Sequence, residues 1–530
     1  MRLWRSGTRR TTAGLVAFVA AAMVLTACGG GGDGGSSATG AEVDPDATLR
    51  IMQGMSASLD PADAPEPAQL TFSTWPVYDR LLQVGPDSTY EPMLATEWEF
   101  TPDGKTVNLS LREGVTFSDG VPFNAEAVKA NLDRGMAADK SALQGNLAPI
   151  ASVEVTGDLT VAVHLKKPTT EILSALASNL GGIMISPKAL KSGDLASHPV
   201  GTGAFTIESF KSGQQAVYVR RTDEDGIWDP KTGKVAKVVI MQQTSIESRS
   251  NALKSGQIDF GGWEGDASTY ASQVSSGQIQ TAPFDGVLSM VGMYFNPKVK
   301  PLDNVKVRQA INLAIDREAI VKAFAPVNQP RVQPWPEGLP GFEESREDAY
   351  PYDIEKAKQL LAEAGYADGF TIPGDFLAAS NSNIDKAGEA IQANLAEIGI
   401  KIKLRTVDIL TQITTYAGGK NPGQFMYISL PSIDAYSWLQ RVFVNPVWNP
   451  SGTSPELIDQ IEGTDDPTLS EEERATKVGA AIDYATENAL FAPLWQGVGG
   501  YAASSKVKGL DTIDSVNGGV ADLRNTWMTK

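Results

Sequence analysis

The spacing of apolar residues changes near Pro283, and this change limits the folds that the chain can adopt. Before Pro283, short segments in which apolar and polar residues alternate are separated by turns, which is typical of hairpins. After it, helical spacing alternates with strand spacing, as in segment 384–398 followed by 400–404. A helix between two strands favours parallel pairing of those strands. The pattern therefore predicts an α/β chain whose second lobe occupies the latter half of the sequence.

The length of the chain also requires more than one lobe. About 480 residues remain after the N-terminal segment, whereas a single hydrophobic core rarely extends beyond about 250 residues. Hydrophobic residues make up 42% of the chain, which is ordinary for a globular protein. Because the sequence contains one cysteine, no internal disulfide can form, and packing must supply the stability.

Four residues stand before segments of helical spacing and have side chains that can cap a helix. They are Asn124, Asp303, Asp316 and Asp353. A short side-chain oxygen at this position accepts a hydrogen bond from a backbone N–H of the first turn. We expect a helix to begin directly after each of them.

The first 27 residues have the order of a secretory signal peptide. Four arginines open the chain, namely Arg2, Arg5, Arg9 and Arg10. An apolar stretch follows at 13–25, and a basic start before an apolar stretch is typical of exported chains. This stretch is shorter than the roughly 20 residues that cross a bilayer. We expect segment 1–27 to be removed and the rest of the chain to be extracytoplasmic.

The signal ends in Leu-Thr-Ala-Cys at 25–28, which resembles the lipobox of bacterial lipoproteins. The resemblance implies that Cys28 receives a diacylglycerol and becomes the first residue after cleavage. A small buried cysteine is the alternative, but the neighbouring Gly, Ser and Asp residues cannot bury it. Segment 28–46 is rich in Gly and Ser and is expected to act as a flexible tether. The body would then be held at the outer face of the cell membrane by lipid on Cys28.

The composition and the motifs present argue against several classes of function. The 63 acidic and 45 basic residues give a formal net charge of -18, which argues against nucleic acid as a partner. No GxxxxGK[ST] segment, which binds the phosphates of a nucleotide, occurs in the sequence. The only histidines are His164 and His198, which poorly support a histidine-rich nickel site. We therefore expect no cofactor and no metal. A secreted lipoprotein hydrolase remains an alternative, although no GxSxG or HExxH motif is present and its catalysis would depend on unrecognised carboxylates.

Several ordered segments resemble those of family 5 extracellular solute-binding proteins, the dipeptide-, oligopeptide- and nickel-binding components of ABC importers. These segments are 78–82, 90–98, 111–120, 199–205, 296–297, 301–311 and 352–365. The resemblance covers essentially the whole mature chain. It implies a protein that is not an enzyme and that captures a peptide or similar small solute. It also implies a monomer whose partners are the permease and ATPase subunits of an importer.

The resemblance further implies an α/β periplasmic-binding-protein-like fold of type II, cluster C, with two lobes joined by a hinge and a small inserted domain. The expected boundaries are lobe I at 47–72, 200–283 and 489–530, the inserted domain II at 73–199, and lobe II at 284–488. Ligand would lie in the cleft between the lobes and would be enclosed when they close.

Positions that face this cleft in members of the family correspond to six candidate ligand-binding residues in this sequence. They are Trp263, Tyr427, Ile428, Asp434, Trp438 and Trp495. The alternative for each aromatic side chain is a place in the core, which is the ordinary position for such residues. Trp263 is the favoured candidate because its Gly-rich and acidic neighbours indicate an exposed loop.

The ligand itself stays open. Peptide-binding relatives carry an aspartate after the strand at Tyr427 that pairs with the peptide's amino terminus, and here that place holds Leu430 or Pro431. The nearest acid is Asp434, which could replace it. A peptide held through backbone hydrogen bonds, a sugar, an opine or another amphipathic solute stacked on tryptophan are all consistent with the sequence.

Overall fold

The computed structural model describes twelve stretches of the chain. They are 42–63, 67–85, 89–223, 226–243, 245–264, 267–283, 289–337, 339–379, 384–429, 434–497, 499–510 and 522–530. The expected signal peptide, Cys28 and most of the tether at 28–46 lie outside them, as do Leu430 and Pro431. Among the described residues, no helix is long and apolar enough to cross a membrane.

A seven-stranded mixed sheet forms the first lobe, in the order β12-β19-β11-β1-β10-β9-β8. Its strands are β1 (Thr48–Gln53), β8 (Phe205–Lys211), β9 (Gln215–Arg220), β10 (Lys237–Gln242), β11 (Phe260–Glu264), β12 (Ile279–Pro283) and β19 (Gly499–Ser504). The central β1 runs parallel to β10 and β11, and the other pairs are antiparallel. Helices α1 (Pro67–Thr74), α6 (Ile246–Lys254) and α7 (Ala271–Ser275) belong to the same part of the chain.

A four-stranded antiparallel sheet, in the order β4-β5-β7-β6, is formed by the early part of the chain. Its strands are β4 (Ala95–Phe100), β5 (Thr106–Leu111), β6 (Ile150–Gly157) and β7 (Thr160–Leu165). The same part of the chain contains the helices α2 (Ala125–Met136), α3 (Ala142–Asn146), α4 (Glu171–Ala177) and α5 (Pro187–Ser192). One hydrophobic core contains Ile51 of the first sheet and Leu109 of this one. The two regions therefore share their packing.

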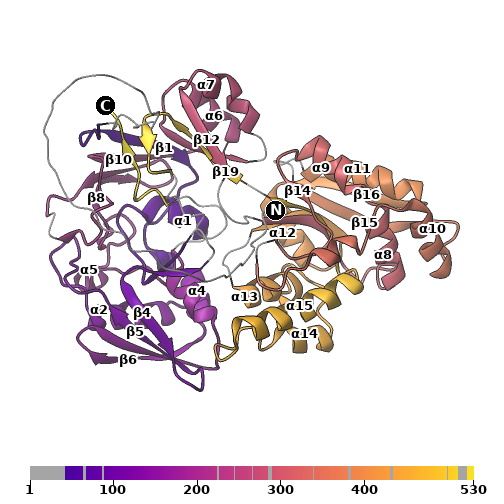
Figure 1. Cartoon of the computed structure of the whole chain (residues 1–530), viewed down its shortest axis with the longest axis horizontal. Coiled ribbons are helices and arrows are strands. Elements are labelled where there is room, and N and C mark those ends of the chain that lie inside the picture. The colour runs from indigo at the N-terminus through magenta and orange to yellow at the C-terminus, as the bar shows by residue number, and fades with distance from the viewer. Residues whose placement is uncertain are drawn as a thin grey trace, which may run out of the picture. The chain divides into compact units, whose positions relative to one another are not determined.

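A six-stranded mixed sheet, in the order β14-β18-β13-β17-β15-β16, forms the second lobe. Its strands are β13 (Ser289–Phe295), β14 (Gln329–Pro330), β15 (Phe370–Ala379), β16 (Ile400–Val407), β17 (Gly423–Ser429) and β18 (Phe491–Gly497). The expected parallel pairing is confirmed for β15 with β16 and β17, and Figure 1 shows β15 and β16 side by side with α11 (Ile384–Glu397). In contrast, β13 runs antiparallel to both β17 and β18.

Helices cover both faces of this sheet. One face packs against α8 (Val305–Ala314), α9 (Arg317–Phe324), α10 (Ile354–Glu363) and α11. The other packs against α12 (Ile409–Ala417), α13 (Ala435–Leu439), α14 (Pro455–Ile461) and α15 (Glu471–Glu487). Two covered faces explain why the central strand β13 and its neighbour β18 are nearly continuous apolar runs, whereas β16 at the end of the strand order alternates.

Three of the four expected helix caps are confirmed. Asn124, Asp316 and Asp353 each accept a backbone hydrogen bond from the third residue after them, at 2.9 to 3.0 Å. The prediction for Asp303 was wrong, because Asn304 caps α8 and accepts from the N–H of Lys306 at 2.9 Å. Both residues can cap, and the position of the first helical turn decides between them.

The boundary expected at residue 489 is also corrected. Segment 491–497 is expected in lobe I, but it forms β18, which pairs with β13 and β14 in the six-stranded sheet. The chain returns to the first sheet only at β19, and residue 498 separates the two strands. An apolar run of this kind can complete either sheet, so its partners decide where it belongs.

The chain passes between the two large sheets at two places, and the strand ends that flank these places are paired with each other. One passage is 284–288, between β12 and β13, and the other is residue 498, between β18 and β19. Ser289 pairs with Gly497 on one side of the passages, and Pro283 pairs with Gly500 on the other. The strand ends on either side of the two connections therefore lie side by side in each sheet.

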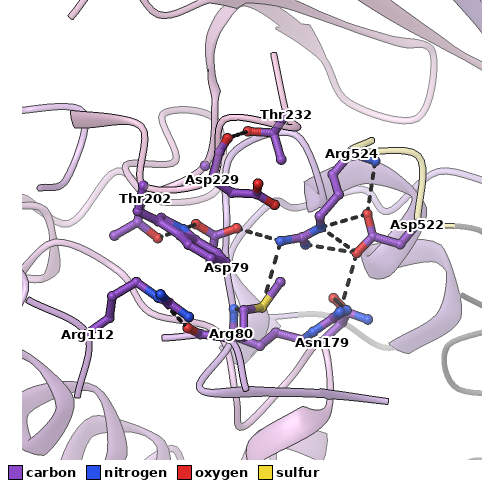
Figure 2. A network of polar contacts seen from close by, with 12 residues as sticks. Asp79, Arg80, Arg112, Asn179, Thr202, Asp229, Thr232, Asp522 and Arg524 are labelled. Atoms are coloured by element: carbon purple, nitrogen blue, oxygen red, sulfur yellow. Dashed lines mark hydrogen bonds and ion pairs between the residues drawn. The ribbon is translucent and has the colours of Figure 1, made fainter. Parts of the chain in front are cut away.

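A buried charge network ties the C-terminal segment to residues of the expected inserted domain and of the first lobe, and Figure 2 shows its members. Arg524 contacts Asp79 at 2.6 Å and Asp522 at 2.8 Å, and Arg80 contacts Asp522 at 3.3 Å. Asp79 also accepts hydrogen bonds from Thr202 and from the indole of Trp228. These contacts give a structural reason for the 78–82 segment that the sequence singled out.

Candidate functional site

Three of the proposed ligand-binding residues lie at one end of the six-stranded sheet. Tyr427 and Trp495 are both in register with Val291, on either side of β13, and Ile428 is in register with Met290. Adjacent strands are about 4.8 Å apart, so the backbones of Tyr427 and Trp495 are separated by about 10 Å. This end of the sheet is the one that borders the two passages, because Ser289 and Gly497 end their strands there.

Trp263, in the first lobe, stands near a strand end that borders the same passages. It stands near the end of β11 and is in register with Gly500, the second residue of β19 after the passage at 498. The structure thus brings together the strand ends that carry Trp263, Tyr427, Ile428 and Trp495, although they come from both lobes. The side chains of Trp263, Tyr427 and Ile428 lie outside the described part of the chain.

The two remaining tryptophans are buried to different depths. Trp495 is 4% exposed and joins the core of the second lobe at the end of β18. Trp438 is fully buried, and its ring lies 5.1 Å from that of Trp335 and 6.0 Å from that of Phe443. This corrects the expectation for Trp438, because α13 turns its side chain into the core beneath α14 and α15.

Asp434 serves as the N-cap of α13. Its Oδ2 accepts hydrogen bonds from the backbone N–H of Ser437 at 2.9 Å and from the Ser437 hydroxyl at 2.7 Å. Its Oδ1 accepts from the hydroxyl of Thr170 at 3.4 Å. Burial raises the pKa of Asp434 above its ordinary value, and the hydrogen bonds from Ser437 oppose that rise. With both oxygens engaged, Asp434 is poorly placed to take over the pairing with a peptide's amino terminus.

Thr170 belongs to a contact between the early region and the second lobe. The backbone N–H of Thr170 donates to the carbonyl oxygen of Asp465 at 2.6 Å. The ammonium of Lys167 lies 3.2 Å from the hydroxyl of Tyr436 and 4.9 Å from the centre of its ring. We call this region, residues 167–171 against 434–436 and 465, the 167–171 contact. Through it the early region, which contains the expected inserted domain, touches the second lobe.

Glu171 is the ionisable group that this contact perturbs most clearly. Burial, together with the nearby carboxylates of Asp434 and Asp465, raises its pKa to about 7, while Lys167 opposes the rise. Tyr436 and Tyr90 also face the cluster, and Arg474 lies close to Asp434. The contact therefore holds Glu171 more readily in its protonated form.

Replacing Glu171 with glutamine is expected to remove a pH dependence of stability. Because the folded pKa is raised from 4.5 to about 7, the wild-type contact has its full strength below pH 4.5 and loses it as the pH rises to 7. At pH 8, the free energy of unfolding of Glu171→Gln should exceed that of the wild type by about 1 to 2 kcal/mol, allowing for partial exposure. Urea unfolding at pH 5 and pH 8 measures the effect. The exposed Glu113→Gln serves as control, and an unchanged pH slope in Glu171→Gln would contradict the assignment.

Sequence reasoning missed Arg331, which lies beside the strand end of Trp495. Its backbone N–H donates to the carbonyl of Leu494 at 3.1 Å, and its guanidinium contacts Gln496 at 3.2 Å and Glu337. The residue is 7% exposed. The sequence carries no signal for this placement, because β14 is only two residues long and has no recognisable alternation.

Sequence comparisons match most of the chain to one family of proteins. A family model described as bacterial extracellular solute-binding proteins, family 5 Middle, matches residues 89–449. The glutathione-binding protein GsiB of Salmonella typhi is 33% identical over 357 residues, which cover 66% of this chain and 67% of that protein.

Solved structures share the mixed α/β fold. DppA of Helicobacter pylori, in complex with the peptide STSA, gives a TM-score of 0.74 at 24% identity and covers 92% of this chain and 98% of its own. AgaA of A. tumefaciens R10, in complex with agropinic acid, gives 0.74 at 24% identity and covers 91% and 99%. Since the family model matches more than half of the residues, the chain belongs to family 5 of the bacterial extracellular solute-binding proteins.

Proposed function

We propose that this protein is the substrate-binding component of an ABC importer, which captures a peptide or similar small solute between its lobes and delivers it to the permease. The observation that carries the proposal is that the strand ends flanking the two passages, in both sheets, are the ones that carry the proposed ligand-binding residues. A ligand that touches both lobes stabilises the closed arrangement by its greater affinity for that arrangement. ATP would be hydrolysed by a separate subunit.

The proposed domains follow the sheets. Lobe I comprises 47–72, 200–283 and 499–530, the inserted domain comprises 73–199, and lobe II comprises 284–497. The passages at 284–288 and 498 would act as the hinge, since a few residues at the ends of strands can absorb the change of backbone angles. The 167–171 contact would then be made and broken as the lobes close and open.

The ligand class is proposed from the relatives. GsiB is named for glutathione, a small peptide, and the DppA complex holds a peptide, whereas AgaA holds agropinic acid. Because Asp434 is engaged as a helix cap, a ligand without a free amino terminus, such as an opine or a sugar, is a second candidate beside a peptide.

Mass spectrometry of small molecules that co-purify with the protein, followed by calorimetry, tests the proposal. We expect one solute to bind and to reduce the radius of gyration in X-ray scattering. Trp263→Ala should weaken that solute by about 1 kcal/mol or more, as the loss of an aromatic stacking partner does. Tyr352→Ala, which removes an aromatic ring that is 46% exposed, is the control and should bind normally. A protein that shows neither heat nor contraction with peptides, opines or sugars would exclude this function.

The lipid anchor is a further part of the proposal. It is supported by the position of Cys28 directly after the apolar segment 13–25 and by its being the only cysteine. Cys28→Ser should move the protein from the membrane fraction to the soluble extracytoplasmic fraction, as an immunoblot of separated fractions would show. Retention in the membrane fraction would contradict lipidation at Cys28.

A further inference from the structure

The 167–171 contact joins two parts of the chain that the proposed closure moves relative to each other. It lies between α4 of the inserted domain and α13 of lobe II, which are neighbours in Figure 1. The inserted domain shares its hydrophobic core with the first sheet, since Ile51 and Leu109 belong to the same core. It therefore moves with lobe I, and a change of backbone angles at 284–288 and 498 would form or break the contact.

Hydrogen bonds from Thr170 hold the two sides of the contact in place. Its backbone N–H donates to the carbonyl oxygen of Asp465 at 2.6 Å, and its hydroxyl donates to the carboxylate of Asp434 at 3.4 Å. Glu171 directly follows Thr170 in the chain. Its carboxyl group is thereby brought close enough to those of Asp434 and Asp465 to be repelled by their charges.

The contact holds more negative than positive charge. Glu171, Asp434 and Asp465 supply three carboxylates, and Asp465 is only 2% exposed. Its Oδ2 atom lies 3.8 Å from the ammonium of Lys167 and accepts no hydrogen bond from the described residues. Arg474 is near Asp434, but its guanidinium donates to two backbone carbonyls. Carboxylates that crowd together in a partly buried place do not all ionise easily, so one of them readily keeps a proton.

Glu171 is the group that can take up this proton near neutral pH. Its side chain is half-buried, and burial together with the two neighbouring carboxylates raises its pKa to about 7. Burial raises the pKa values of Tyr90 and Tyr436 above 10, so both stay protonated in this range. The exposed Glu462 faces Lys167 from the same side as Asp465. When the lobes separate, water reaches Glu171 and its pKa returns toward the ordinary value of 4.5.

We propose that the 167–171 contact is a proton-dependent switch that favours the closed arrangement of the lobes in acid and the open arrangement above neutral pH. The switch rests on the lobe movement of the proposed function and adds a control by pH. Because Glu171 binds a proton more tightly in the contact than in water, the contact is fully stabilised below pH 4.5 and loses this stabilisation as the pH rises through about 7. By reciprocity, a solute that closes the lobes causes a proton to bind, and its affinity falls as the pH rises.

X-ray scattering from the purified protein without added solute, at pH 5 and pH 8, tests the proposal. We expect a larger radius of gyration at pH 8, with a ratio of closed to open molecules about tenfold lower than at pH 5. This change is smaller than the full shift of the Glu171 pKa would give, because partial exposure weakens the effect. Circular dichroism at both pH values checks that the chain stays folded.

Two variants test the role of the carboxylates. Glu171→Gln should keep the smaller radius at both pH values, because an amide does not ionise. Asp465→Asn removes one of the carboxylates that raise the pKa of Glu171, so it should move the midpoint of the expansion about one pH unit lower. Glu126→Gln is the matched control and should behave as the wild type. Glu126, like Glu171, lies in the first turn of a helix of the inserted domain, but it is exposed.

The proposal is overturned if the wild type has the same radius at pH 5 and pH 8, if Glu171→Gln expands as much as the wild type, or if Asp465→Asn leaves the midpoint unchanged. Because no solute is present, these outcomes are separate from the test of the transport function. A protein that contracts with a solute but not in acid would keep the proposed function and lose the switch. A protein that contracts in acid but with none of the solutes would keep the switch and lose that function.

Discussion

Replacing Asp522 with asparagine is expected to lower the free energy of unfolding by about 3 to 5 kcal/mol, the range seen when one partner of a buried charge pair is removed. Asp522 is 4% exposed and lies between the guanidinium groups of Arg80 and Arg524. Asparagine keeps the shape of the side chain but removes its charge. Arg80, which is fully buried, would then lose the carboxylate that it contacts at 3.3 Å.

The pH dependence of the same network supports the test. Burial alone would raise the pKa of Asp522, but Arg524 and Arg80 hold it below the ordinary value of 3.8. The stabilisation is therefore present above pH 3.8 and is lost as the pH falls through the lower pKa of the folded state.

Urea unfolding at pH 7, followed by tryptophan fluorescence, measures the effect of Asp522→Asn. Asp139→Asn is the control, because Asp139 is exposed, and its midpoint should match that of the wild type. A change below about 1 kcal/mol in Asp522→Asn would mean that the network is hydrated rather than buried.

Gly201→Ala is expected to be the second most damaging change, at about 3 kcal/mol. A Cβ atom at this position would lie 2.1 Å from the carbonyl oxygen of Val77 and 2.6 Å from Cδ1 of Tyr78. The Val77 carbonyl cannot simply move away, because it already accepts a hydrogen bond from the N–H of Gly203 at 2.8 Å. Gly201 itself is held by the N–H of Ser118, which donates to its carbonyl at 2.9 Å.

Gly145→Ala is the matched control for this substitution. Gly145 lies in α3, and a Cβ atom there would have no neighbour within 4 Å. Alanine should leave stability unchanged or raise it by up to about 1 kcal/mol, since it favours a helix more than glycine does. Equal melting temperatures for Gly201→Ala and the wild type would show that segment 199–205 can move away from Val77.

The family and the fold class could be predicted from the sequence because they depend on local patterns and their order. Alternation over 400–404 requires only neighbouring residues, and it appears as β16 (Ile400–Val407). Capping by Asn124 or Asp353 likewise depends on residues within one turn. The motif at 199–205 marks a real steric requirement, which the close approach of Gly201 to Val77 explains.

The candidate site could be predicted only in part. The strand at Tyr427 and Ile428 could be recognised in the sequence, whereas the loop expected around Trp263 is instead strand β11 (Phe260–Glu264). The structure brings the strand ends that carry these residues and Trp495 near one another. The sequence did not indicate that Trp438 is buried, because an aromatic residue on a short helix can face either the core or a cleft. It did not indicate Arg331, which is placed by the short pairing of β14 with β18.

The sequence by itself determined many of the local elements and the family, because these depend on residues close together in the chain and on the order of short motifs. Tertiary structure alone decided that β18 completes the second sheet and that Asp434 meets Thr170, which is 264 residues away. It also decided that Arg80 and Asp522 form a buried pair across 442 residues. The physical reason is that whether a residue is buried or paired depends on the residue it contacts. When that residue is distant in the chain, the local sequence pattern carries no signal of the contact.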